Sequence, residues 1–583
     1  MAASFGQPSM PDPISQSAPP LAGRDMLRDC LFLGAVVALS LVTYVGSLGF
    51  YSDDWSFLGW LSVAKEPTLT GLYRSINAPN VQMRPAAIFY LALDYFLFGH
   101  NPLGYQLVNG VLLVAAVLLF YLALRELELP RLLALAVPAV YALLPHYSTI
   151  RVWAVASSIT LMLAAYFLSL FADLRAVRSR GPRLAAWKLL SVAALVVSVL
   201  AYELALPLFV LNAGLVWYLG RRRRPPAERH VWLPSRELWL ALGTVAPLVP
   251  LAAFKLATTV RLPHGGPADA LKALLRRTVV LYYGEYDFGF NLWRAIRVAF
   301  GTYGLGLPQV AARALRDYPD PATMAVAVVA GALVFLYLRR VAGGTGGVPD
   351  RRVMGLMAVA GVVVFGLGYA IFLTNWNVGF SPAGIINRTA AAAAIGVALV
   401  FVGLAGYAST WLRSDRLRRL GFAGTVALLC GTGTLINDTI AAFWVAAYAT
   451  ERNVLHDIEQ AFPSVQPETT LILDGVCPYD GPAIVFESSW DLAGALLLHY
   501  GDYTVQADVV TPRLAVGEDG LDTSLYGATH HYPYGRLFVY NASDKTVHRL
   551  RTAEDARRYF TEVSPDRGRW CPSGHEGYGA RIF

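Results

Sequence analysis

Two adjacent carboxylates follow the first long apolar segment of the chain, in the sequence Tyr51-Ser52-Asp53-Asp54-Trp55. That segment is long enough to cross a bilayer, so both carboxylates are expected within one helical turn of a membrane boundary. An ionised carboxylate at such a boundary carries a desolvation cost and is a functional candidate by default. A carboxylate can accept the proton of an attacking hydroxyl group, which makes the pair a candidate for general base catalysis. The alternative is an interfacial anchor in which Trp55 and its acidic neighbours contact lipid headgroups.

The two carboxylates also affect each other's protonation. A neighbouring negative charge raises the pKa of a carboxyl group, which improves it as a base near neutral pH but also allows the pair to share one proton. The sequence does not decide which of the two aspartates titrates. The oxygens of Asp53 and Asp54 can hold Mg²⁺ or Mn²⁺, or the reaction can proceed without a metal, and the sequence leaves both possibilities open.

Residues in other segments can complete a site around the pair. Arg84, Arg151 and Arg388 can neutralise an anion, and the alternative for the first two is snorkelling at the membrane interface. Glu203 lies between two short apolar runs, where it either lines a wet cavity or pairs internally. His100, His146 and His264 have no His or Cys partner at ligand spacing, so no metal site is predicted at these histidines. The candidate substrate-binding residues are Trp55, Arg84, His146, Arg151, Glu203, Asn375 and Arg388.

The composition identifies a membrane protein. Of 583 residues, 55% are hydrophobic and only 15% are charged, whereas soluble domains carry about 25% charged residues. The mean hydropathy is +0.46. The net charge is +8, and most of the arginines fall in short clusters between uncharged runs of membrane-spanning length. Arginines in such positions set the topology of a membrane protein, so a nucleic acid partner is not expected.

Eleven uncharged runs are suited to membrane-spanning helices. They cover residues 31–50, 104–124, 132–146, 152–172, 189–202, 204–220, 238–254, 323–338, 354–374, 389–412 and 421–437. Basic clusters fall in alternate connections, and the positive-inside rule places these connections in the cytoplasm. Segment 84–98 is only about 22 Å long as a helix and carries Asp94, so we predict a half-embedded helix there rather than a span.

These features predict a polytopic α-helical protein of the cytoplasmic (inner) membrane, with about eleven spans and a small C-terminal α/β or α+β domain outside the cytoplasm. The predicted parts are a disordered cytoplasmic N-terminus at 1–28, a transmembrane domain at 29–438 with its first outer loop at 51–103, and an extracytoplasmic domain at 439–583. Short strands are predicted at 470–475, 483–489 and 536–541.

Four cysteines are too few for a disulfide scaffold. Cys30 and Cys430 lie at or inside apolar runs, where buried small hydrophobic side chains are expected. Cys477 and Cys571 lie in the polar C-terminal region. They form either a disulfide, which suits an oxidising compartment, or two free thiols.

The order of motifs resembles the GT-C superfamily of membrane glycosyltransferases, and within it the protein O-mannosyltransferase-like and related bacterial branches. The motifs are Ser52-Asp53-Asp54-Trp55 after a span, Arg84-Pro85, Leu97-Phe98-Gly99-His100-Asn101-Pro102, Tyr105-Gln106-Leu107-Val108-Asn109, Pro145-His146-Tyr147-Ser148 with Arg151, and Tyr202-Glu203. Tyr202 stands where the family has a lysine. The resemblance covers about the first 210 residues at the level of motifs.

The resemblance implies a polyprenyl-phosphate sugar as donor, with an acidic residue at the end of the first span as base. Asp53 occupies the position of the family's leading aspartate, so the resemblance implies that Asp53 is the base, and we expect Asp54 to orient the acceptor or a cation. The implied function is inverting transfer of a hexosyl or pentosyl group to a glycan, lipid or protein acceptor outside the cytoplasmic membrane, in cell envelope or cell wall biogenesis. The sugar, the acceptor and the oligomeric state are not encoded in any motif that we recognise.

Two other functions are compatible with parts of the sequence. A transporter or flippase of lipid-linked saccharides would need polar residues near the middle of the membrane and repeat symmetry between halves. An assembly protein would use its outer domain to bind a cell-wall partner, and Asp53 and Asp54 would then be anchors only.

Overall fold

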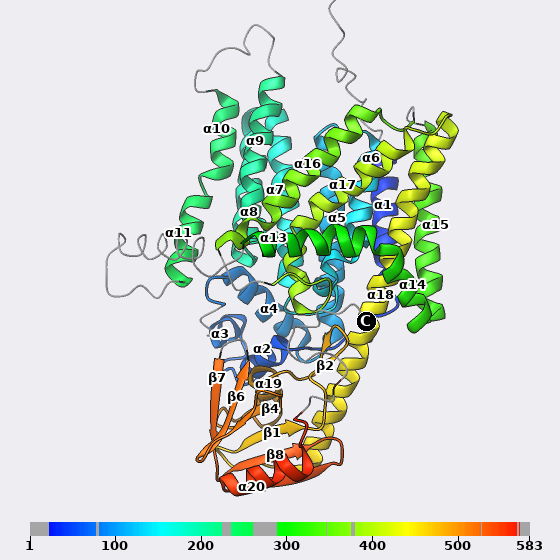
Figure 1. The fold of residues 1–583 in the computed structure, drawn as a ribbon. Helices are drawn as coiled ribbons and strands as arrows, with labels where there is room; N and C mark the ends of the chain where they lie inside the picture. Colours follow the sequence, from blue (N-terminus) through cyan, green and yellow to red (C-terminus); the bar gives the residue numbers. More distant parts are fainter. Residues whose placement is uncertain are drawn as a thin grey trace, which may run out of the picture.

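The computed structural model describes residues 23–76, 81–223, 235–259, 288–344, 347–374, 379–525, 528–567 and 571. It consists of a bundle of long helices and a C-terminal domain built around a small sheet (Figure 1). The bundle contains α1 (Gly23–Leu39), α5 (Pro102–Glu126), α6 (Arg131–Leu143), α7 (Ser157–Arg178), α8 (Gly181–Ala201), α9 (Leu206–Arg222), α10 (Arg236–Val245), α11 (Leu248–Thr259), α15 (Pro321–Gly344), α16 (Arg351–Ala370), α17 (Ala393–Ser409) and α18 (Asp415–Ala461).

Each of the eleven apolar runs predicted as spans contains at least part of a described helix. Seven helical segments of the described chain are long and apolar enough to cross a membrane. The number becomes eight if α6 and the bent 3₁₀ helix η1 (Pro145–Arg151) form one span. The chain is therefore a multi-pass membrane protein, and the count of eleven stays a prediction.

The N-terminal boundaries differ from those predicted. The helix α1 begins at Gly23, so residues 23–28 of the segment predicted to be disordered are helical, and residues 1–22 lie outside the described residues. Ion pairs explain this early start, because Asp25 and Asp29 both contact Arg131. At its other end α1 stops at Leu39, before the end of the predicted run, and the backbone continues in turns.

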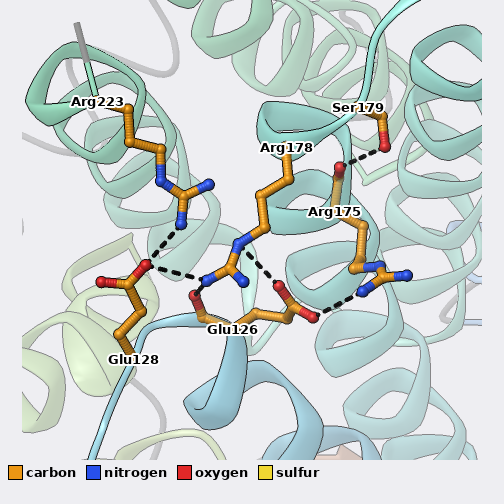
Figure 2. A network of polar contacts seen from close by, with 6 residues as sticks. All are labelled: Glu126, Glu128, Arg175, Arg178, Ser179 and Arg223. Atoms are coloured by element: carbon orange, nitrogen blue, oxygen red, sulfur yellow. Dashed lines mark hydrogen bonds and ion pairs between the residues drawn. The ribbon is translucent and has the colours of Figure 1, made fainter. Parts of the chain in front are cut away.

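Arginines and glutamates join helix ends far from the outer segment (Figure 2). Glu128 accepts ion pairs from Arg178 and Arg223, at 3.3 and 2.7 Å. Glu126 contacts Arg178 at 3.0 Å and Arg175 at 3.1 Å. These contacts connect the end of α5 with α7 and the end of α9. They involve the basic clusters for which the positive-inside rule predicts a cytoplasmic position.

The first outer segment folds into three short helices. They are α2 (Asp53–Ser62), α3 (Leu69–Ser75) and α4 (Pro85–Phe98). The helix α4 has 14 residues and is about 21 Å long, less than the roughly 30 Å of a hydrocarbon core. This length agrees with the prediction of a helix that does not cross the membrane. Its N-terminus is set by Pro85, which is favoured in the first helical turn.

The helix α18 connects the bundle to the C-terminal domain (Figure 1). It has 47 residues and is about 70 Å long, which is far more than one bilayer requires. The C-terminal half of this helix contacts the strands β2 (Tyr479–Asp480) and β3 (Ala483–Ile484) of the C-terminal domain.

The C-terminal domain mixes parallel and antiparallel strands. Its main sheet has the order β4-β1-β8-β9, in which β1 lies parallel to β4 and β8, and β9 is antiparallel to β8. A second sheet has the antiparallel order β5-β6-β7. The strands are β1 (Thr470–Asp474), β4 (Gln506–Val509), β5 (Ala515–Val516), β6 (Gly520–Leu525), β7 (Ala528–Pro533), β8 (Leu537–Asn541) and β9 (Thr546–Leu550), with the helices α19 (Ser489–Tyr500) and α20 (Ala553–Arg558).

Two of the three predicted strands are confirmed, as β1 and β8, whereas the strand predicted at 483–489 is wrong beyond Ile484. The reason is a capping box, in which the side chains of Ser488 and Asp491 satisfy backbone N–H groups and start α19. Cys477 and Cys571 form a disulfide with their Cα atoms 5.6 Å apart, so the disulfide alternative is confirmed. Cys430 is fully buried, as predicted.

The C-terminal domain docks on α2 through two glycines. A Cβ atom at Gly59 of α2 would lie 2.6 Å from the carbonyl oxygen of Gly494 in α19. A Cβ atom at Gly494 would overlap the backbone nitrogen of Ser56. The two helix backbones therefore touch directly, as small residues permit in tightly packed helix pairs.

This contact predicts that Gly494→Ala destabilises the docking of the outer domain. Backbone atoms cannot rotate away from the added methyl group, so we expect a loss of about 1–3 kcal/mol in the free energy of unfolding. The measurement is thermal unfolding of the purified protein. Gly214→Ala in α9 is the matched control, because a Cβ atom there meets nothing within 4 Å. Equal melting temperatures for both variants would contradict the docking contact.

Candidate active site

The carboxylate pair begins α2 at a strained turn. The backbone N–H of Asp54 donates to the carbonyl of Tyr51 at 2.9 Å, and Ser52 between them has φ 48° and ψ −120°. These angles match the first central position of a type II′ turn, which favours glycine. A non-glycine residue there costs about 1–3 kcal/mol and persists only where its surroundings hold it.

The carboxylate of Asp54 has a structural role. It is 2% exposed, and its two oxygens accept hydrogen bonds from the backbone N–H groups of Tyr51 at 2.9 Å and Val155 at 2.7 Å. Burial raises the pKa of Asp54 to about 8, although these N–H groups act in the opposite direction. Asp54 thus fastens the start of α2 to the segment that precedes α7.

The carboxylate of Asp53 has different surroundings. Asp53 is half-buried, and its side chain has no hydrogen-bond partner among the described residues. Burial raises the pKa of Asp53, and the positive charges of Arg388 and Arg84 offset part of this rise. Asp53 therefore combines an unused carboxylate, an elevated pKa and two nearby guanidinium groups.

A cluster of ionic side chains lies beside the N-terminus of α4. Arg84 binds both oxygens of Glu203, at 3.1 and 2.5 Å, and its guanidinium group lies 3.8 Å from the centre of the Tyr202 ring. Lys255 donates to Glu203 and to the carbonyl of Met83, both at 3.1 Å. We refer to Arg84, Tyr202, Glu203 and Lys255 as the cationic cluster.

The cationic cluster is ionised. Burial alone would raise the pKa of Glu203, but Arg84 and Lys255 outweigh burial and lower it to about 2. The guanidinium pKa of Arg84 is raised, because the neighbouring Tyr202 and Glu203 overcome its desolvation. Two cations and one anion leave one net positive charge on Arg84, Glu203 and Lys255. The internal pairing predicted as one alternative for Glu203 is what the structure shows.

An apolar cavity of about 560 Å³ borders the cationic cluster. Its walls come from α3, α4, α8 and α11, through residues that include Tyr73, Pro85, Leu200 and Phe254. Arg74 contributes a positive charge to the wall. An apolar space next to a positive charge suits an amphiphilic anion.

Arg388 is linked to the turn that carries Asp53 through an aromatic side chain. Its guanidinium carbon lies 5.1 Å from the centre of the Trp153 ring, and Arg388 also donates to the carbonyl of Ile385. The indole N–H of Trp153 in turn donates to the carbonyl of Tyr51 at 3.0 Å. Arg388 is thus positioned by a residue bonded to the turn that carries Asp53.

Three residues predicted to bind substrate lie in the protein interior instead. Arg151 is 4% exposed and donates to the hydroxyl oxygens of Ser40 and Tyr44. The side chain of His146 is 2% exposed and contacts the carbonyl of Ala299 at 2.9 Å. Trp55 is 6% exposed and packs among aromatic rings of the core. These three residues shape the interior, and Asn375 lies outside the described residues.

Each oxygen of Asp54 already accepts one backbone N–H, so Asp54 is the weaker cation ligand of the pair. A divalent cation at the aspartate pair would be held mainly by Asp53, with waters and a donor phosphate as its other ligands. In the described chain, no group of three or more His, Cys, Asp or Glu side chains could hold a metal ion.

Sequence reasoning missed Lys255 and Trp153. A signal for Lys255 was available, because it is a single lysine at the end of the apolar run 238–254. Charged residues in or beside spans are functional candidates. Trp153 carried no comparable signal, since aromatic residues are common throughout the chain.

Comparisons with known proteins give distant structural matches only. No family model matches the chain, and no curated protein matches it. The structure is similar to that of ArnT from Cupriavidus metallidurans bound to undecaprenyl phosphate, with 18% identity over 82% of this chain and 86% of that chain and a TM-score of 0.38. It is also similar to the oligosaccharyltransferase AglB from Archaeoglobus fulgidus in complex with an inhibitory peptide and a dolichol-phosphate, with 12% identity over 78% of this chain and 63% of that chain and a TM-score of 0.35.

These similarities are distant, so the proposed function rests on the residues of the site.

The different surroundings of the two aspartates predict different effects on stability. Asparagine has one acceptor oxygen, so Asp54→Asn leaves one backbone N–H without its partner and should cost about 1–3 kcal/mol. Asp53→Asn breaks no hydrogen bond in the described chain and should leave the melting temperature unchanged. Thermal unfolding of the two purified variants compares them directly, and equal losses would contradict the structural role of Asp54.

Proposed function

We propose that this chain is an inverting glycosyltransferase that moves a sugar from a polyprenyl-phosphate carrier to an acceptor hydroxyl outside the cytoplasmic membrane. The observation that carries the proposal is the state of Asp53. It is a half-buried carboxylate without a hydrogen-bond partner in the described chain, and Arg388 and Arg84 act on it electrostatically. An unused carboxylate near cations at a membrane boundary suits acid–base chemistry on an anionic substrate.

Asp53 acts as the general base in this proposal. A sugar or protein hydroxyl is a weak nucleophile, so a carboxylate must accept its proton as the new bond to the anomeric carbon forms. The bond between this carbon and the phosphate oxygen breaks in the same displacement, which inverts the anomeric configuration. Asp54 fixes the turn and takes no part in the proton transfer, because both its oxygens hold backbone N–H groups.

The cationic cluster and the adjacent cavity receive the donor. A departing polyprenyl phosphate needs positive charge rather than a proton, since phosphate is already a good leaving group. The net positive charge shared by Arg84, Glu203 and Lys255 meets this need, and Arg388 supplies a further cation near Asp53. The apolar cavity offers space for the first prenyl units. Undecaprenyl phosphate and dolichol-phosphate, which the similar structures bind, belong to the same chemical class.

The acceptor is a glycan, lipid or protein hydroxyl presented on the outer side. The C-terminal domain is attached to α2, the helix that begins with Asp53. An acceptor that reaches Asp53 from the aqueous side therefore approaches between this domain and the bundle. The proposed location is the cytoplasmic membrane, with the basic clusters of Figure 2 inside and the site outside.

The central prediction is that Asp53→Asn lowers kcat about 100-fold or more, because general base catalysis supplies 10²–10⁴-fold. The assay uses purified protein in lipid nanodiscs with a panel of synthetic polyprenyl-phosphate sugars, and it measures transfer and release of polyprenyl phosphate. In the wild type, the rate should fall as the pH falls through the raised pKa of Asp53, because the base must be ionised. Undiminished transfer by Asp53→Asn would disprove the assignment.

The cationic cluster yields a separate prediction for donor binding. Lys255→Met removes one cation while Glu203 keeps both bonds to Arg84, so the fold is retained and the cluster becomes neutral. We expect the KM for the donor to rise about tenfold. This factor corresponds to roughly 1.5 kcal/mol, the contribution of one hydrogen bond to a charged group. Arg223→Ala at the opposite end of the bundle is the control and should leave the KM unchanged. An unchanged KM in Lys255→Met would place the donor phosphate elsewhere.

A further inference from the structure

We propose that the C-terminal domain positions the catalytic base through Ser52, with Glu487 and Trp490 as positioning residues. This inference rests on the proposed role of Asp53. It assigns to the outer domain a part in the transfer step itself, in addition to any contact with the acceptor.

Ser52 occupies a backbone conformation that its own residue type disfavours. Its φ of 48° lies in the region that favours glycine. Glycine would relieve the strain, so a serine at this position indicates that its hydroxyl group is used. Ser52 directly precedes Asp53, and its backbone angles therefore set the direction in which the Asp53 side chain leaves the turn.

Among the described residues, only side chains of the C-terminal domain form hydrogen bonds with the hydroxyl group of Ser52. It donates to the carboxylate of Glu487 at 3.3 Å, and it accepts from the indole N–H of Trp490 at 3.4 Å. Ser52 is 2% exposed, so solvent does not compete for these bonds. The strained turn thus depends on two side chains more than 430 positions further along the chain.

Glu487 and Trp490 are themselves fixed. The second carboxylate oxygen of Glu487 accepts from the hydroxyl of Tyr479 at 2.5 Å, and its backbone N–H donates to Asp491 at 2.7 Å. Trp490 lies in the first turn of α19, where its backbone N–H donates to the side-chain hydroxyl of Ser488. A separate hydrogen bond, from the hydroxyl of Ser56 to the backbone carbonyl of Trp490, does not involve the indole N–H that reaches Ser52.

The contact between α2 and α19 transmits this arrangement. The two helices touch through Gly59 and Gly494, so α19 cannot shift without moving the start of α2. Movement of the outer domain would release Ser52 and let the turn relax. A misplacement of about 1 Å at a reacting group can cost about 100-fold in rate, so transfer should depend on correct docking of the outer domain.

The test compares Ser52→Ala and Trp490→Phe with Ser56→Ala in the full-length protein in nanodiscs. Trp490→Phe keeps an aromatic ring and loses the N–H donor to Ser52, whereas Ser56→Ala removes a hydrogen bond between the same helices without touching Ser52. We expect kcat to fall about 10- to 100-fold in the first two variants, with an unchanged KM for the donor. Ser56→Ala should retain the wild-type kcat, and Ser52→Gly should exceed Ser52→Ala because glycine adopts the turn without strain.

The double variant Ser52→Ala/Trp490→Phe should be no slower than Ser52→Ala alone, since Ser52→Ala already removes the oxygen that accepts from Trp490. Additive losses, or an equal loss in Ser56→Ala, would overturn the proposal. Hydrogen–deuterium exchange over residues 50–58 gives a readout that needs no activity. Faster exchange in Trp490→Phe than in Ser56→Ala supports the positioning role even if no donor is turned over, and identical exchange contradicts it.

Discussion

The carboxylate of Asp54 joins two parts of the chain that are far apart in sequence. One oxygen accepts the N–H of Tyr51 in the turn before α2, and the other accepts the N–H of Val155 before α7. Because Asp54 is 2% exposed, water does not weaken these bonds. Trp153 adds a third link from the same segment to the carbonyl of Tyr51. These bonds hold the start of α2 against the bundle, and they leave Asp53 as the carboxylate of the pair without a hydrogen-bond partner in the described chain.

The same physical logic separates structural from reactive charges elsewhere in the molecule. Asp29 is fully buried, yet Arg131, Tyr121 and Tyr337 all donate to its oxygens, so it is a structural group. Lys188 and Thr244 satisfy Asp173 between the helices in a similar way. Buried charges persist only when they are paired or hydrogen-bonded. Asp53, near cations but without a bonded partner in the described chain, stands apart from these residues, as expected of a group kept available for a substrate.

The sequence was sufficient for features that depend on neighbouring residues. The apolar runs, the carboxylate pair after the first of them and the short helix at 84–98 follow from local composition and length. Long-range partners were not accessible. Asp54 bonds to a residue 101 positions away, and Glu203 to Lys255 and Arg84, which lie 52 and 119 positions away. The division of roles between the two aspartates depends on these contacts, so no local pattern could assign it.

Burial also explains the predicted site residues that lie elsewhere. Arg151, His146 and Trp55 follow or precede apolar runs, where residues at a membrane surface and residues inside a bundle have the same local sequence. The structure places their side chains in the interior. Conversely, the hydroxyl of Ser52 acquires its partners only when the outer domain folds back on α2, and no spacing rule links position 52 with position 490.

The stereochemistry of the transferred sugar tests the central claim most directly. Wild-type protein would be supplied with a donor of known anomeric configuration and the product examined by nuclear magnetic resonance. One displacement, with Asp53 as the base, predicts a glycoside of inverted configuration. Retention of configuration would require a covalent intermediate on a nucleophilic carboxylate, and it would contradict the role that we propose for Asp53.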